Sequence, residues 1–340
     1  MDLASRILAF SQLGDMLRKL SAKENNIASL VETAKVRNGW FTEENIRYAL
    51  KHWGKLLTKE NLEQWTAPYG LEDSPTPKKV AIVMAGNIPL VGFHDFLSVL
   101  ISGHHAVIKL SSNDTVLLPF LSEKLIEINP SFKERISFSE EKLPHFDAVI
   151  ATGSNNTARY FEYYFGKHPN IIRKNRNGVA VLTGTESKED LHALANDIFR
   201  YFGLGCRNVS KIYLPASYDF DPFFNAMFTW KQVIDHHKYM NNYDYNKAVY
   251  LMSDIPLLDN EFMLLKEDTD FASPISVVHY EYYDSIETLE QELQNQQQEI
   301  QCIVGHLEGH DPIPLGESQL PQLNQYADGI DTLGFLQSLS

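Results

Sequence analysis

One cysteine lies in a setting that suits a nucleophile. Cys206 stands in the segment FGLGCRN, between a predicted helix and a predicted strand. Gly203 and Gly205 allow a ligand to approach the backbone closely, and Arg207 together with local amide dipoles would favour the thiolate over the thiol. Such a thiolate can carry an acyl group as a thioester. The competing interpretation is an inert core residue, because free cysteine is among the most often buried residue types.

Fingerprints of several other chemistries are absent from the sequence. There is no Walker A loop, no HExxH motif and no CxxC motif, and the 2 cysteines are Cys206 and Cys302. Thiols alone therefore cannot build a disulfide framework or a zinc cluster. His236 and His237 are adjacent, but without a carboxylate at helical spacing they make a poor set of ligands. We predict no metal site. The nearest approach to a GxGxxG loop ends in Asn208, so a dinucleotide would need another phosphate cradle.

The charge balance and the distribution of apolar residues exclude several classes of partner. The chain has 30 Lys+Arg against 44 Asp+Glu, a formal net charge of −14, which would repel a nucleic-acid backbone. Charged residues recur near the N-terminus and leave no apolar core for a signal peptide. Nowhere do about 18 apolar residues run together, as a spanning helix requires. We expect a cytoplasmic protein with no nucleic-acid partner and no membrane span.

The elements that must position these residues change in kind along the chain. Residues 1 to about 68 show helical spacing of apolar residues, and the Pro-rich segment APYGLEDSPTPKK follows as a linker. After it, short apolar strands alternate with helices, which predicts a doubly wound α/β fold with parallel strands. Ser187 and Asp190 resemble a capping box at the start of a helix that reaches about Phe202. In such sheets, sites lie at the carboxyl ends of the strands.

Four short motifs follow one another in the alternating region. They are AGNIPL at 85–90, HAVIKLSSND, ATGSNNTAR and GLGC. In this order, over roughly residues 80 to 300, the chain resembles the aldehyde dehydrogenase superfamily. Within that superfamily it resembles the acyl-CoA reductases, including the reductase subunit of the bacterial luminescence fatty-acid reductase complex. Each motif is weak when taken alone, whereas their order and spacing are much more specific.

The resemblance assigns a role to each motif. Asn87 would donate its amide to an oxyanion, and Cys206 would be the nucleophile. Lys109 would contact the adenosine ribose of a nicotinamide cofactor, and Gly153 with Ser154 would open the helix near its pyrophosphate. Each of the residues that precede Cys206 also has a structural explanation: an ordinary turn, a solvated charge at a strand end, or an ordinary helix start.

The resemblance also implies the architecture. It predicts an aldehyde dehydrogenase-like α/β fold with two doubly wound domains and an N-terminal helical segment. Residues 1–70 would form the helical segment, 71–177 the nicotinamide cofactor-binding domain, 178–310 the catalytic domain with the nucleophilic cysteine, and 311–340 a C-terminal segment.

A missing carboxylate narrows the reaction. Hydrolytic aldehyde dehydrogenases carry a Glu-Leu-Gly-Gly-Lys block whose glutamate activates water, but no carboxylate occurs between Lys167 and Thr185. Without a base to deprotonate water, a thioester on Cys206 should survive long enough to exchange with another thiol or to accept hydride. That chemistry suits an acyl-CoA reductase that forms an aldehyde.

A second departure bears on the cofactor. Relatives that prefer NAD place a glutamate three residues after the ribose-contacting lysine, and here that position is Ser112. A serine would not repel a 2′-phosphate, and Lys109 could pair with it, so we predict NADPH. Asp114 argues against this, because it lies close enough in sequence to replace the missing acid.

Two further segments allow two interpretations each. The basic cluster Arg173, Lys174 and Arg176 could meet phosphates of CoA or NADPH, although a solvated surface run is the commoner explanation. The aromatic residues of YDFDPFFNAMFTWK could line an acyl tunnel, although such a stripe is more often core.

The competing functions come from two classes. A reductase of acyl phosphates, similar to the glutamyl phosphate reductases, would also use a basic cluster. A noncatalytic binding protein that keeps the fold would explain the missing glutamate and the short length. By analogy with relatives we expect a homo-oligomer and, as a partner, an enzyme that activates the acyl group.

Overall fold

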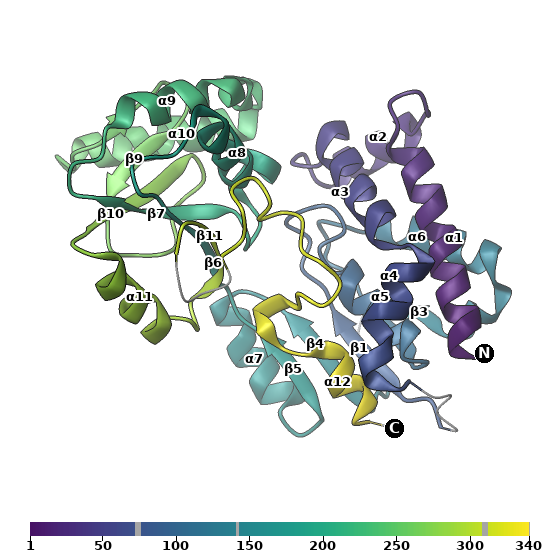
Figure 1. Cartoon of the computed structure of the whole chain (residues 1–340). Helices are drawn as coiled ribbons and strands as arrows, with labels where there is room; N and C mark the ends of the chain where they lie inside the picture. Colours follow the sequence, from purple (N-terminus) through teal and green to yellow (C-terminus); the bar gives the residue numbers. More distant parts are fainter. Residues whose placement is uncertain (72–75, 141–142, 308–311, 340) are drawn as a thin grey trace. The chain divides into compact units, whose positions relative to one another are not determined.

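The computed structural model of the chain describes residues 1–71, 76–140, 143–307 and 312–339 (Figure 1). These residues form two compact units. The first comprises Met1–Lys174 and Gln322–Ser340, and the second comprises Asn175–Pro321. The change of unit falls close to the predicted boundary at 177/178, whereas the predicted boundary at 310/311 lies outside the described residues.

The first unit contains a parallel sheet of five strands in the order β3-β2-β1-β4-β5. Its central strands are almost continuously apolar because helices cover both faces, as the alternating pattern predicts. The strand order reverses between β1 and β4, because β2 and β3 lie on one side of β1 whereas β4 and β5 lie on the other. The strands are β1 Lys79–Val83, β2 His105–Lys109, β3 Ile136–Phe138, β4 Ala148–Thr152 and β5 Asn170–Arg173.

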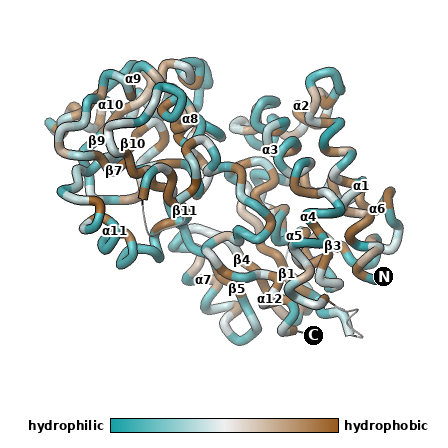
Figure 2. Tube along the Cα trace, viewed as in Figure 1, coloured by the Kyte–Doolittle hydropathy of each residue, from teal (hydrophilic) through white to brown (hydrophobic). Residues whose placement is uncertain are grey.

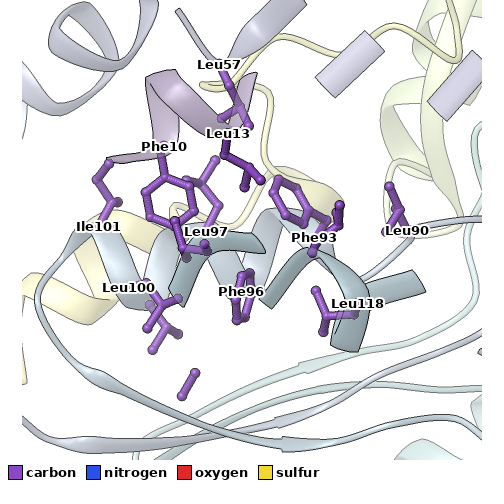
Figure 3. Packing of buried hydrophobic residues seen from close by; sticks show 14 of the residues in the cluster. Phe10, Leu13, Leu57, Leu90, Phe93, Phe96, Leu97, Leu100, Ile101 and Leu118 are labelled. Atoms are coloured by element: carbon purple, nitrogen blue, oxygen red, sulfur yellow. The ribbon is translucent and has the colours of Figure 1, made fainter. Parts of the chain in front are cut away.

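The central helix of the first unit is α5, Phe93–Ile101. All its residues except His94 are buried, and it contacts β1, β2, α1 and α12. Phe10 and Leu13 of α1 lie beside it in the core (Figure 3). The N-terminal helices therefore share one core with the sheet instead of forming a body of their own. The other helices of this unit are α1 Leu3–Ser21, α2 Ala28–Arg37, α3 Glu43–Leu56, α4 Lys59–Thr66, α6 Leu117–Ile128, α7 Asn155–Phe165 and α12 Thr332–Gln337.

The second unit contains a sheet of six strands in the order β11-β6-β7-β10-β9-β8, of which only β8 is antiparallel to its neighbour. Hydrophobic residues concentrate along the strands of each sheet (Figure 2). The strands are β6 Asn177–Val181, β7 Val209–Pro215, β8 Leu258–Asp259, β9 Leu264–Glu267, β10 Val277–Tyr283 and β11 Ile300–Gly305. The fold class predicted from the sequence is thus confirmed in both units.

Helices cover both faces of the second sheet. α8 (Lys188–Phe199), α9 (Phe220–Met227) and α10 (His237–Met252) lie on one face, and α11 (Ile286–Asn295) lies on the other (Figure 1). α8 begins with the predicted capping box, in which the Ser187 and Asp190 side chains each bind the other residue's backbone N–H. The aromatic stripe is partly core, because Phe223 and Met227 are buried while Phe228 is exposed. No helix in the described ranges is long and apolar enough to span a bilayer.

The residues of the predicted basic cluster form separate contacts with different partners. Arg173 is 4% exposed, and its guanidinium donates to Asp95 on α5 at 2.6 Å and to the Thr332 hydroxyl at 2.9 Å. Lys174 forms an ion pair with Glu162 at 3.0 Å. For Arg173, both the phosphate interpretation and the solvated-surface interpretation are wrong, because its charge is neutralised inside the first unit.

Replacing Asp95 with alanine should strongly destabilise the first unit. The substitution leaves the Arg173 guanidinium buried without its carboxylate, which costs about 3–5 kcal/mol. Urea denaturation followed by tryptophan fluorescence measures this loss. The control is Glu127→Ala, which removes an exposed ion pair with Lys124 and should change stability by less than about 1 kcal/mol. Equal effects of the two substitutions would contradict the structural role of Arg173.

Candidate functional site

Three adjacent strands bring the predicted cofactor residues to one edge of the first sheet. Val83 at the end of β1 pairs with Lys109 of β2 and with Ala151 of β4. Because the strands are parallel, the turns that follow them leave the sheet at the same edge. Lys109 is the last residue of β2, and the turns carry the other predicted site residues of this unit, namely Asn87, Ser112, Gly153 and Ser154. This edge lies where the strand order reverses, the usual position of a ligand in open α/β sheets.

The turn with Asn87 is held from two directions. A Cβ on Gly86 would lie 2.7 Å from the Ser111 side chain, so the turn after β1 rests directly on the turn after β2. Asn38 follows α2, and its side-chain amide donates to the Gly86 carbonyl at 3.1 Å. The N-terminal helical segment thereby fixes the backbone next to Asn87, a role that the sequence had left open.

The N-terminus of α7 has the geometry of an anion-binding helix start. Ser154 is its N-cap, and its hydroxyl accepts the Thr157 N–H at 3.3 Å. Gly153 packs closely on the helix, since a Cβ there would lie 3.0 Å from the Thr157 and Phe161 side chains. The amides of a helix start bind phosphates, and this one is exposed at the edge described above. The ordinary capping role and the predicted phosphate role are compatible here.

Asp114 does not take the place of the missing glutamate. Its side chain is buried, and one oxygen accepts the Leu117 N–H at 3.2 Å at the start of α6. Burial raises the pKa of this carboxyl to about 6. Ser112 is exposed. Lys109 thus ends β2, an exposed helix start follows β4, and position 112 carries no carboxylate.

Cys206 lies in the second unit, just before β7. Its side chain is exposed, so it is not an inert core cysteine, whereas Cys302 is buried and burial raises the pKa of that thiol to about 12. The position is at the amino end of β7. The predicted residues of the first unit lie at or after the carboxyl ends of their strands, whereas Cys206 precedes its strand.

The backbone between α8 and Cys206 adopts a rare conformation. Tyr201, Phe202 and Gly203 all have left-handed backbones, with φ of 55°, 59° and 74°. For the two residues with side chains this costs about 1–2 kcal/mol each. Phe202 is held there by packing, because its ring lies against that of His236 with centroids 4.4 Å apart and the ring planes tilted by 37°. His236 thus has a packing role. Across the described ranges, no group of three or more His, Cys, Asp or Glu side chains is arranged to hold a metal.

Asn208 is the residue of this loop that sequence reasoning missed. Its side-chain oxygen accepts the Gly205 N–H at 2.8 Å. Its side-chain nitrogen donates to the carbonyls of Asp197 at 2.9 Å and Arg200 at 2.8 Å. The available signal was its type and place, since asparagine after a Gly-containing turn commonly binds nearby backbone.

The loop is also tied to residues 316–318. Arg207 donates through Nε to the Ser318 carbonyl at 2.6 Å. The Asp197 carboxylate accepts the N–H groups of Gly316 at 2.6 Å and Ser318 at 2.9 Å. The Arg207 guanidinium is therefore engaged with this segment, and its effect on the Cys206 thiol stays a prediction.

Comparison with solved structures defines the class of fold. Aldehyde dehydrogenase 21 from Physcomitrella patens superposes with a TM-score of 0.69 at 12% identity, covering 100% of this chain and 84% of that one. An NADP-dependent enzyme from E. coli gives 0.62 at 13% identity, covering 86% and 71%. The fold is that of the aldehyde dehydrogenases.

Sequence comparison defines the family within this fold. Residues 11–222 match the model of the family described as acyl-CoA reductase (LuxC), and the chain belongs to that family. It is 25% identical over 171 residues to the long-chain acyl-protein thioester reductase of Aliivibrio fischeri, covering 45% of this chain and 35% of the relative. The Vibrio harveyi protein of the same name is 23% identical over 146 residues, covering 38% and 31%. The matches span about a third of the length of these relatives.

The buried Asp197 carboxyl predicts a pH dependence of stability. Its side chain is 0% exposed, and burial raises its pKa to about 6 from 3.8. Because the folded-state pKa is the higher one, the folded chain binds the proton more tightly, and the stability from this group is lost as pH rises through about 6. The unfolding free energy of the wild type minus that of Asp197→Asn should fall by about 2 kcal/mol between about pH 4 and pH 7.

Urea denaturation at a series of pH values measures this difference. Asp244→Asn, on the exposed side of α10, is the matched control for loss of an acidic side chain in the same unit. A difference for Asp197 that is flat, or that grows with pH, would contradict the burial of an ionisable carboxyl at this position.

Proposed function

We propose that the chain reduces acyl thioesters, with fatty acyl-CoA as substrate, to aldehydes through an acyl group carried on Cys206. The observation that carries the proposal is an exposed cysteine on a hydrogen-bonded loop in a member of the acyl-CoA reductase family. Exposure of Cys206 argues against a noncatalytic protein that merely keeps the fold.

The proposed reaction has two stages. The Cys206 thiolate attacks the acyl carbonyl carbon, a new C–S bond forms, and the C–S bond to CoA breaks so that CoA leaves as its thiolate. A backbone N–H near Cys206 would hold the oxyanion, and the predicted part of the Asn87 amide in this step stays a prediction. When bound, NADPH supplies the hydride. The thioester on Cys206 would then become a thiohemiacetal oxyanion, and cleavage of its C–S bond would release the aldehyde and return the Cys206 thiolate.

The thioester on Cys206 can accept hydride only if no nearby base activates water to hydrolyse it. The first carboxylate after the gap in the sequence is Glu186, and it follows β6 at the carboxyl end of that strand. Glu186 accepts the N–H groups of Thr183 at 2.6 Å and Gly184 at 3.0 Å. Cys206 lies at the amino end of the neighbouring parallel strand, β7, so Glu186 is poorly placed to serve as its base.

The first alternative is a reductase of acyl phosphates, for which a basic cluster near the site would also make sense. Two residues of that cluster are engaged in ion pairs, Arg173 with Asp95 and Lys174 with Glu162, which weakens this support. The names of the relatives suggest a different alternative for the carrier, an acyl group on a protein thioester instead of CoA. A homo-oligomer, a cytoplasmic location and a partner enzyme that activates the acyl group remain proposals by analogy.

Replacing Cys206 with alanine should abolish the reaction. Purified protein mixed with palmitoyl-CoA and NADPH should oxidise the cofactor, measured by nicotinamide absorbance, and release palmitaldehyde. The variant should lose this rate by at least about a thousandfold, because it lacks the proposed acyl acceptor. Cys302→Ser is the control and should retain the activity. Substrate-dependent oxidation that survives in Cys206→Ala would refute the mechanism.

Replacing Ser112 with glutamate should turn the cofactor preference towards NADH. A carboxylate at this exposed position would repel the 2′-phosphate and suit a free ribose hydroxyl, so KM for NADPH should rise about tenfold or more while KM for NADH does not. Steady-state kinetics with both cofactors measures the change, and Ser112→Ala serves as the control that adds no charge. A wild type that clearly prefers NADH would show that the NADPH proposal is wrong.

A further inference from the structure

Asn208 joins the residue before Cys206 to the end of α8. Its side-chain nitrogen donates to main-chain carbonyls at the end of that helix, and its side-chain oxygen accepts the Gly205 N–H. Its own N–H donates to the Gly205 carbonyl at 3.0 Å. Both polar main-chain groups of Gly205 are thus bound by one residue. Asn208 is 3% exposed, so these hydrogen bonds form out of water.

The backbone that follows Cys206 is pressed against neighbouring strands. A Cβ on Gly178 of β6 would lie 2.6 Å from the Asn208 carbonyl oxygen and 2.8 Å from that of Arg207. The Cys302 thiol of β11 lies 3.7 Å from the Arg207 carbonyl oxygen. Gly205 is therefore held on one side of Cys206, and Arg207 with Asn208 on the other.

The exposed thiol lies between these two fixed points. Its direction follows from the backbone at Gly205 and Arg207, because a cysteine side chain has a single rotatable bond before the sulfur. A displacement of about 1 Å at a nucleophile can cost about 100-fold in rate. A residue that fixes this backbone would therefore affect chemistry more than substrate binding.

We propose that Asn208 is a positioning residue for acyl transfer, whose side-chain amide fixes the backbone beside Cys206 and so the direction in which the thiol is presented. The proposal rests on the proposed function insofar as Cys206 is the acyl acceptor. It does not depend on the identity of the natural acyl carrier or of the cofactor.

The test uses the full-length chain and p-nitrophenyl acetate, a small ester that reports acylation without CoA or NADPH. The burst of p-nitrophenolate gives the acylation rate constant, and the same variants are tested with palmitoyl-CoA and NADPH. Asn208→Ala should lower the acylation rate constant about 10-fold to 100-fold and change the apparent KM for the ester much less. Asn208→Asp keeps the side-chain acceptor for Gly205 but cannot donate to the carbonyls, so it should be slowed as well, and it replaces the alanine variant if that one does not fold.

The matched control is Asn246→Ala. Asn246 is also buried in the second unit and donates to a main-chain carbonyl, that of Ile275, at 2.9 Å. It should lower the melting temperature by a similar amount while the burst rate stays near that of the wild type. An unchanged burst rate in Asn208→Ala, or an equal slowing in Asn246→Ala, overturns the positioning role.

The readouts separate the two proposals. A wild type that shows the ester burst but does not reduce acyl-CoA contradicts the proposed function, while the Asn208 variants still decide the positioning role. A wild type with no burst on either substrate overturns both, because Cys206 would then accept no acyl group.

Discussion

Main-chain carbonyls at the end of a helix need new partners when the chain leaves in a left-handed turn, and this requirement shapes the loop that carries Cys206. After α8 three consecutive residues, Tyr201–Gly203, are left-handed, which no continuing helix could accommodate. Asn208 supplies the missing donors, and packing of Phe202 on His236 stabilises the strained backbone. The result is a cysteine that is exposed although its neighbours are fixed, the arrangement that a nucleophile requires.

In the first unit, segments far apart in sequence come together at one edge of the sheet, the candidate cofactor site. A parallel sheet brings the turns after β1, β2 and β4 to one edge, and the strand order reverses there, which is where ligands usually bind in open α/β sheets. The helices before β1 are part of this construction, because Asn38 binds the backbone at Gly86 and α1 packs on α5. The N-terminal segment therefore belongs to the architecture of the candidate site.

The sequence predicted those features whose signals are local. Apolar runs located most strands of both sheets, and Ser187 with Asp190 marked the start of α8 because a capping box spans four residues. The predicted end of that helix at Phe202 was too late, since nothing local marks the left-handed turn. Arg173 was misjudged because its partner Asp95 lies 78 positions away. Asn208 was overlooked because its role depends on how the end of α8 folds back over it.

Mass spectrometry of the acylated protein and of its peptides tests the central claim most directly. The chain is mixed with palmitoyl-CoA without NADPH, digested and mapped. The account predicts a single added palmitoyl group on Cys206 with release of one CoA, and loss of that group as palmitaldehyde when NADPH is added. A chain that gains no acyl group, or gains it on a residue other than Cys206, would contradict the account.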